Sequence, residues 1–443
     1  MNNSEKYNLL TESEVKMESC MAIIPRDSQT NAFSENYIRR SLSNHTGIKL
    51  EQLSQNEDTF NAKISYRDVS YSVDIYTLEI ANLNLQSYGF ANHIDDESFR
   101  LARLQKKCIC VSLYFGADNL DSFLFQLKLL DALVPSASLV IDFVSYRLLS
   151  PHWLKMTAQS DTPPSPDYLY TLHCVFDEKE DGERRYWFHT HGLLRCGSVE
   201  LEMINIGKGY EQMQVLINTT VKKFLTSPSK ECERFTIGYD GMGINLCWLR
   251  WEEAIKQFPT DTLGGANDRK GKENVHTDPG GVIFAVEDGN MISPEIYAST
   301  LAVNPIYYIS TEETNRMSAL AKERYNLFLK AYKKKYISPG KRNIFKKIFR
   351  KNNDEQYWAF LVKLGLTVDN AQSWDEREHL WFEVLSSSER WIKGKLLNQP
   401  YWITELNEGD VREFPIELLT DWVIYAPGTS YTPDTIYDLE VEN

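Results

Sequence analysis

The chain has 443 residues, too many for one ordinary hydrophobic core, so several domains are expected. Its hydrophobic content of 42% and charged content of 25% are typical of folded proteins and exclude disorder over the whole length. The net charge of −14 argues against nonspecific nucleic-acid binding by the chain as a whole, because phosphate contacts need clustered Lys and Arg.

The cysteines and the N-terminus indicate the compartment. Seven cysteines at irregular spacing, with no Cys-x-x-Cys pair, do not form the pattern of a disulfide framework. The N-terminus has acids where a signal peptide needs a basic start, and no run approaches about 18 apolar residues. We therefore expect a cytoplasmic protein with reduced thiols and no transmembrane segment.

The first part of the chain predicts one α+β domain. Residues 1–16 are polar and are expected to be a flexible N-terminus. In residues 17–156, strand patterns alternate with three amphipathic helix patterns, and residues 61–80 have the alternation of a hairpin. The polar, proline-bearing stretch 157–167 is typical of a linker or long loop.

Residues 168–310 predict a second α+β domain. "YLYTLHCVFDE" and "RRYWFHTH" are strand patterns joined by the acidic turn "KEDGE", and "SVELEMINI" is a third strand pattern. A helix and another strand pair follow. Residues 261–281 contain five glycines and almost nothing apolar, which indicates a long exposed loop, and such loops are usually functional or disordered.

The C-terminal part combines a basic helical linker, residues 311–351, with a compact module, residues 352–443. The module is expected to begin with a helix near "DEQYWAFLVKLG", followed by short strands whose regular turn spacing suggests a barrel. The predicted fold class is therefore α+β and multidomain: two sheet-plus-helix domains followed by a small β-rich, barrel-like module.

The residues of this module carry a resemblance to a known family. The pattern is an aromatic-rich strand with Trp381, then Gly-x-Leu-x-Asn-x-Pro beginning at Gly394, then Gly409-Asp410, then Asp421-Trp422. It resembles the YegJ-like domain of uncharacterised bacterial proteins. "HTHGLLRCGSVELE" also resembles a segment of long bacterial proteins with this C-terminal module. The resemblance implies a bacterial, cytoplasmic protein. Because related modules occur in proteins that neutralise toxins of neighbouring bacteria, it also implies binding rather than catalysis.

One segment offers a candidate metal site. His189 and His191 are spaced i, i+2 on a predicted strand, so both imidazoles project from one face. Zn²⁺ or another transition metal would need further ligands, and Cys196, Glu200 and Glu202 are the nearest candidates. If the next strand pairs back on this one, the two glutamates face the histidines.

The alternative interpretation is a strand–turn–strand in which the polar residues serve the fold. Turns at Gly192 and Gly197 need a polar scaffold, which histidine donors could supply. His276 could be a third ligand, although an Asp-Pro-Gly turn after it explains the segment as well. The glycine-rich loop fails as a phosphate loop, because Glu273 occupies the position where Ser or Thr must hold Mg²⁺.

A second candidate surface lies near the C-terminus. Residues 321–351 contain twelve Lys or Arg and one acid, a local charge of +11, which suits a connecting helix, an acidic protein partner, a membrane surface or RNA. The module that follows is rich in tryptophan, some of which could be binding hot spots. The partner-binding candidates are Trp381, Trp391, Trp402, Trp422, Lys333, Lys334 and Lys335.

These patterns favour a non-enzymatic, cytoplasmic interaction protein that binds a protein partner and neutralises or regulates it, with no cofactor required. Nucleic acid and membrane surfaces are the less favoured partners. The competing hypothesis is a metal-dependent hydrolase centred on His189 and His191, with Zn²⁺ as the cofactor.

Overall fold

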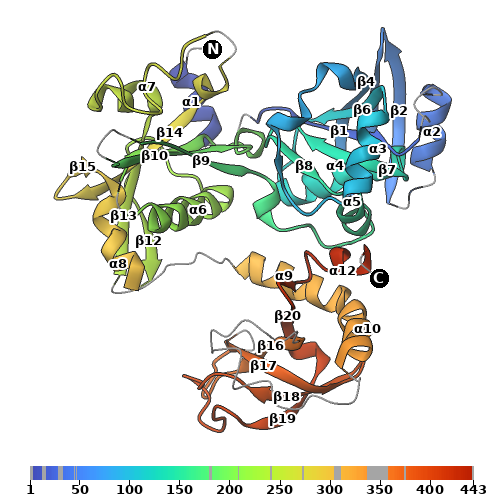
Figure 1. Cartoon of the computed structure of the whole chain (residues 1–443), viewed down its shortest axis with the longest axis vertical. Helices are drawn as coiled ribbons and strands as arrows, with labels where there is room; N and C mark the ends of the chain where they lie inside the picture. The colour runs from blue at the N-terminus through green and yellow to red at the C-terminus, as the bar shows by residue number, and fades with distance from the viewer. Residues whose placement is uncertain are drawn as a thin grey trace. The chain divides into compact units, whose positions relative to one another are not determined.

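The computed structural model (Figure 1) describes residues 3–11, 16–27, 33–43, 45, 47–178, 182–207, 209–239, 242–271, 274–303, 311–336, 358–373 and 376–441. The chain divides into two compact units. Unit 1 comprises Met1–Ala158 and Pro164–Ile309, and unit 2 comprises Gln159–Pro163 and Ser310–Asn443. Across these described ranges, the helices are all too short or too polar to cross a bilayer.

Unit 1 contains an eight-stranded sheet with the order β2-β3-β4-β6-β1-β7-β8-β5. Its strands are β1 (Ser19–Pro25), β2 (Ile48–Asn56), β3 (Thr59–Tyr66), β4 (Val69–Glu79), β5 (Gly89–Phe90), β6 (Lys107–Leu113), β7 (Ala137–Asp142) and β8 (Arg147–Leu149). The helices between and after these strands are α2 (Glu35–Ser43), α3 (Asp96–Leu104), α4 (Asn119–Leu133) and α5 (Pro151–Ala158). Helix α1 (Asn3–Thr11) precedes β1, and its Tyr7 and Leu10 belong to the core of the second sheet. The expected hairpin in residues 61–80 is present as β3 and β4.

A second, seven-stranded sheet of unit 1 has the order β12-β13-β14-β11-β10-β9, with β15 paired to β14. Its strands are β9 (Thr171–Glu178), β10 (Arg184–His191), β11 (Glu200–Ile206), β12 (Phe235–Tyr239), β13 (Met242–Arg250), β14 (Gly280–Glu287) and β15 (Asn290–Ile292). The accompanying helices are α6 (Tyr210–Thr226), α7 (Trp251–Ala254) and α8 (Ala298–Val303). Strands β11 and β14 are parallel, and the other pairs are antiparallel.

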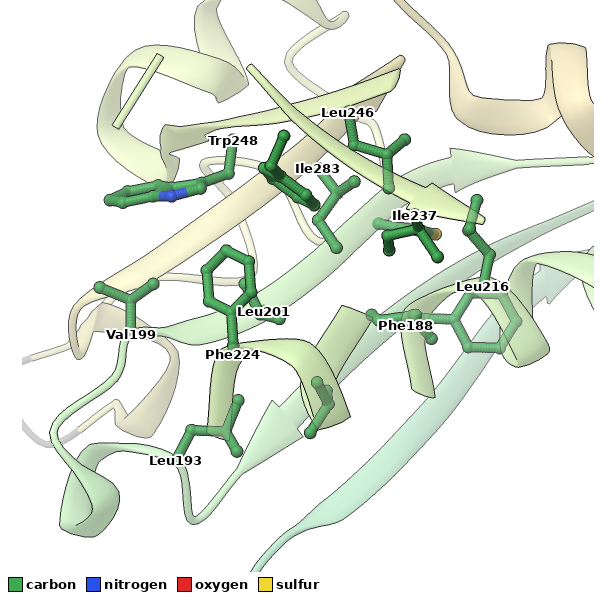
Figure 2. Packing of buried hydrophobic residues seen from close by; sticks show 14 of the residues in the cluster. Phe188, Leu193, Val199, Leu201, Leu216, Phe224, Ile237, Leu246, Trp248 and Ile283 are labelled. Carbon is green, nitrogen blue, oxygen red and sulfur yellow. The ribbon is translucent and has the colours of Figure 1, made fainter. Parts of the chain in front are cut away.

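The two faces of this second sheet are covered differently. Helix α6 packs on one face, where Phe188 of β10 and Leu201 of β11 meet Leu216 and Phe224 of the helix (Figure 2). The segment that contains α7 covers the opposite face, where Trp187 lies in a separate apolar cluster (Figure 1). Since side chains alternate along a strand, odd-numbered residues of β10 face the α7 segment and even-numbered ones face α6.

Unit 2 contains a six-stranded antiparallel sheet with the order β19-β18-β17-β16-β20-β21. Its strands are β16 (Ala359–Thr367), β17 (Arg377–Ser387), β18 (Trp391–Leu396), β19 (Val411–Pro415), β20 (Leu419–Ala426) and β21 (Thr429–Tyr431). Its helices are α9 (Thr311–Glu323), α10 (Tyr325–Tyr336) and α12 (Tyr437–Val441). Phe328 of α10 contacts the rings of Phe360 and Trp422, so the helices pack on one face of the sheet.

The structure confirms the multidomain α+β fold class and corrects three details. The C-terminal sheet is open rather than barrel-like, because its described edge strands β19 and β21 do not pair with each other. The predicted helix near "DEQYWAFLVKLG" is wrong for residues 359–365, which belong to β16, where Phe360, Val362 and Leu364 alternate toward the core. Residues expected to be flexible include helix α1, whose Tyr7 and Leu10 are buried.

Candidate metal centre

Two histidines of β10 lie on the sheet face opposite α6. His189 and His191 alternate with Phe188 and Thr190, so their imidazoles share the face of Trp187. Their exposed fractions are 4% and 9%. The i, i+2 spacing therefore brings two buried imidazoles to one face, as the sequence pattern predicts.

A third histidine reaches them from the glycine-rich loop. His276 lies in a short 3-10 turn, Val275–Thr277, and one nitrogen from each of His189, His191 and His276 lies within 4.8 Å of the others. The ring centroids of His276 are 4.7 Å from His189 and 5.5 Å from His191. These three imidazoles form what we call the histidine cluster.

The surroundings keep the histidine cluster neutral. Burial, followed by repulsion from the neighbouring imidazoles, lowers the pKa of His189 to about 2 and that of His191 to about 3. Burial also lowers the pKa of His276, although the nearby Glu202 carboxylate opposes the shift. Neutral imidazole is the form that ligates a metal, so protons do not compete for these nitrogens near pH 7.

A buried arginine fixes the loop that carries His276. The Arg269 guanidinium donates to Glu202 Oε2 of β11 at 2.6 Å and to the carbonyl oxygen of His276 at 2.5 Å. It also donates to the carbonyl of Gly264 at 3.0 Å and lies over the ring of Trp251. The loop that was expected to be exposed is thus held against the sheet where the structure describes it.

Glu202 belongs to this tether. Besides Arg269, its carboxylate accepts a hydrogen bond from the indole N–H of Trp187 at 2.8 Å. It lies directly across from His189 in the strand register, as the predicted strand pairing implies. Because the cation and the indole already satisfy the carboxylate, its role in this arrangement is to position Arg269 and Trp187.

Glu200 caps the turn after β10. Its carboxylate accepts hydrogen bonds from the hydroxyl of Thr190 at 2.6 Å and from the backbone N–H groups of Gly192, Leu193 and Leu194 at 2.8, 2.9 and 3.3 Å. A side chain at Gly192 would meet the carbonyl oxygen of Leu169 at 2.3 Å, so the turn requires glycine there. The polar scaffold of the turn is therefore a glutamate, and the histidines are not needed for it.

Cys196 is buried rather than exposed. Its side chain lies in the 3-10 turn Leu194–Cys196 with an exposed fraction of 4%, and burial raises the pKa of the thiol to about 12. Its sulfur contacts the carbonyl oxygen of Gly192 at 3.9 Å. The histidine cluster thus contains His189 and His191 from the predicted ligand set, with His276 added and without Cys196, Glu200 or Glu202.

Two further aromatic residues border the histidine cluster. His173 of β9 is the cross-strand neighbour of His189, and its ring lies 5.2 Å from His189 and 5.2 Å from His191. Tyr146 places its ring 4.9 Å from His191 and has a φ of 54°, an unusual conformation for a bulky residue. The hairpin around "KEDGE" could have revealed His173, since a symmetric register puts it opposite His189. For Tyr146, which follows β7 of the other sheet, we find no sequence signal.

The tryptophans predicted to bind a partner differ in their exposure to solvent. Trp391 and Trp402 are exposed by 49% and 68%, and Trp381 is half-buried with the Lys363 ammonium 5.7 Å from its ring. Trp422 is fully buried, and its indole N–H donates to the Ala321 carbonyl, so it belongs to the core and cannot contact a partner directly.

The three lysine candidates, Lys333, Lys334 and Lys335, lie in the last turn of α10. The Lys335 ammonium is 5.0 Å from the ring centroid of Trp358. The rest of the basic segment, residues 337–351, lies outside the described residues.

Three family models match the chain. The N-terminal model of a protein of unknown function, DUF4026, matches residues 19–164, and the C-terminal DUF4026 model matches residues 172–284. The model of an uncharacterised protein conserved in bacteria, DUF2314, matches residues 312–440, which include α9 and α10 as well as the sheet. No curated protein and no solved structure matches significantly.

Proposed function

For this chain, which matches the N- and C-terminal DUF4026 models and the model of DUF2314, an uncharacterised protein conserved in bacteria, we propose transition-metal binding by the histidine cluster. The single observation that carries the proposal is the convergence of His189, His191 and His276, with nitrogens within 4.8 Å of one another. Two of these residues come from a strand and the third from a loop 85 positions later, so chance proximity along the chain does not explain the convergence.

The chemistry of the donors indicates the class of ion. Imidazole nitrogen suits Zn²⁺, Cu²⁺, Ni²⁺ and Fe²⁺, whereas Mg²⁺ and Ca²⁺ prefer oxygen ligands. The two carboxylates predicted as ligands, Glu200 and Glu202, are held by backbone N–H groups and by Arg269, which favours the nitrogen-only set. Whether a bound ion acts in hydrolysis or is only held depends on what fills its remaining coordination position.

Metal analysis of the full chain, purified without an affinity tag, tests the proposal. We expect about one equivalent of a transition metal per chain, or uptake of one equivalent of added Zn²⁺. A His189→Ala/His191→Ala variant should lose it. The matched control is His152→Ala, because His152 lies in α5 outside the cluster and pairs with Asp95. Metal content that is negligible, or equal in all three proteins, would overturn the proposal.

A second candidate function is binding of a protein partner by unit 2, in the bacterial cytoplasm, as the YegJ-like resemblance implies. The observation that favours it is the exposure of three large aromatic residues: 49% for Trp391, 86% for Tyr401 and 68% for Trp402. Exposed aromatic residues of this size are common hot spots in interfaces. This candidate is compatible with metal binding, because the histidine cluster belongs to unit 1.

Co-purification from the native host tests this second candidate. A protein partner should be recovered in a stoichiometric amount with the full chain and lost with Trp391→Ala/Trp402→Ala. A Val175→Ala variant, which changes an exposed apolar residue of unit 1, should retain it. Recovery that is equal for both variants would count against the aromatic surface.

A further inference from the structure

A fourth histidine, His173, lies beside the three-histidine site. Its ring centroid lies 5.2 Å from that of His189 and 5.2 Å from that of His191, and the His189–His191 separation is also 5.2 Å. His173 and His189 are direct cross-strand neighbours on adjacent antiparallel strands, so their side chains project from the same face.

These separations are those of a tetrahedral site. A Zn–N bond of about 2.05 Å places an imidazole centroid about 3.2 Å from the ion, so two ligands at the tetrahedral angle have centroids about 5.2 Å apart. Five of the six ring pairs among His173, His189, His191 and His276 have centroids 4.7 to 5.5 Å apart, close to this value. The spacing of His173 from His189 and His191 is therefore that of ligands to one four-coordinate ion.

Two buried nitrogens of the same group lack hydrogen bonds. Among the described residues, His173 Nε2 and His189 Nδ1 have no hydrogen-bond partner. A buried polar atom without a partner costs free energy of about 1–3 kcal/mol, and native structures rarely keep two of them in neighbouring side chains. A metal ion bound by both nitrogens removes this cost.

We propose that His173 is the fourth ligand of the metal ion and closes its coordination shell. The inference rests on the proposed metal-binding function. Nitrogens of the other three histidines already lie within 4.8 Å of one another. His173 lies outside that group, so ligation requires its ring to turn about χ2, which is a soft torsion in histidine. Four protein ligands are the arrangement of structural zinc sites, whereas hydrolytic sites keep one position for water.

A coordination shell of four protein ligands gives the ion a structural role. The four ligands come from β9, β10 and the loop before β14, so the ion would join an edge strand, its neighbour and the loop. Such an ion holds structure together and leaves no exchangeable position for a substrate. The proposed occupant is a divalent ion that accepts four neutral nitrogens, such as Zn²⁺ or Co²⁺.

Cobalt substitution of the full chain tests the fourth ligand. With Co²⁺ bound, the wild-type protein should show the intense visible absorption of a four-coordinate ion, unchanged by added azide. His173→Phe keeps the ring but removes the nitrogens, so the variant should still bind Co²⁺, should shift its spectrum on azide addition, and should bind Zn²⁺ at least about tenfold more weakly. His152→Phe, a histidine replacement outside the cluster, should behave like wild type.

The outcomes separate the two proposals. If wild type binds no Co²⁺ and no Zn²⁺, metal binding itself fails and the fourth ligand with it. If wild type binds the ion but its spectrum responds to azide, or if His173→Phe keeps the wild-type spectrum and affinity, only the fourth ligand is overturned. Should His173→Phe not fold, the azide response of the wild-type protein still decides the question.

Discussion

Arg269 and Glu202 form a buried ion pair that joins the glycine-rich loop to the second sheet, with 2.6 Å between Nη2 and Oε2. Their side chains are exposed by 1% and 5%, and the residues are 67 positions apart in the sequence. The same guanidinium donates to the carbonyl of His276, so the pair determines where the third histidine lies.

Loss of the cation should destabilise unit 1. We expect Arg269→Met to lower the free energy of unfolding by about 3–5 kcal/mol, because it leaves the Glu202 carboxylate buried without its partner. Lys256→Met is the control: it removes an exposed pair with Glu253 and should change stability by less than about 0.5 kcal/mol. Urea unfolding followed by tryptophan fluorescence measures both. Equal midpoints for the two variants would show that the buried pair does not hold the loop.

Alanine substitutions at two glycines of the same loop distinguish the effect of the loop's contact with the sheet from the effect of backbone strain. Gly264 and Gly271 both have positive φ, 78° and 109°, so alanine is strained at either position. A Cβ at Gly264 would lie 2.7 Å from the Trp187 ring, whereas one at Gly271 meets nothing within 4 Å. Gly264→Ala should therefore weaken Zn²⁺ binding by about tenfold or more, or about 1.4 kcal/mol, with Gly271→Ala close to wild type. Competition with a chromogenic chelator measures the affinities, and a larger effect for Gly271→Ala would contradict the docked loop.

Glu200 should affect stability without acting as a ligand. Glu200→Gln keeps one acceptor oxygen but places an amide N–H₂ among donors, and we expect a loss of about 1–3 kcal/mol in the free energy of unfolding. Metal content should stay at that of wild type. Glu211→Gln, at the start of α6, serves as the exposed control. Loss of metal in folded Glu200→Gln would restore this residue to the ligand set.

Periodicity explains how much of the site could be predicted. The alternation of β10 and the turn spacing before it place His189 and His191 on one face, and the pairing of β11 places Glu202 across from His189. These are relationships between neighbours in the sheet, and local patterns carry them. The apolar alternation of residues 359–366 was available in the same way, although a helix was predicted there.

The rest of the site depends on contacts between distant residues. His276 approaches the strand because Arg269 meets Glu202, and no local pattern signals an ion pair across 67 positions. Strand β14, which is parallel to β11 and central in the sheet, was not assigned, although it follows the glycine-rich loop directly. The roles of Glu200 and Cys196 likewise follow from the conformation of one turn, which depends on how closely Gly192 approaches Leu169.

The metal-free protein should lose stability in mild acid. The pKa of His189 is lowered to about 2 and that of His191 to about 3, below the ordinary value of 6.5, so the unfolded chain binds protons that the folded chain does not. The contribution of these two histidines to the free energy of unfolding is therefore fully present above pH 6.5. It is lost as the pH decreases toward 3, by up to about 1.4 kcal/mol per pH unit for each histidine. Urea midpoints of the chelator-treated protein from pH 7.5 to 4.5 measure the slope. His189→Phe/His191→Phe should flatten it, and an unchanged slope would assign the acid sensitivity to other groups.

The tryptophans of unit 2 should divide into core and surface. Trp422 is fully buried against Phe328 and donates to the Ala321 carbonyl, so Trp422→Ala should cost about 3–5 kcal/mol in the free energy of unfolding of unit 2. Trp402 is 68% exposed, and Trp402→Ala should change it by less than about 1 kcal/mol, although both variants delete the same side chain. Thermal unfolding monitored by circular dichroism compares them. A large loss with Trp402→Ala would mean that its ring supports the fold, and it would then no longer be a candidate for contact with a partner.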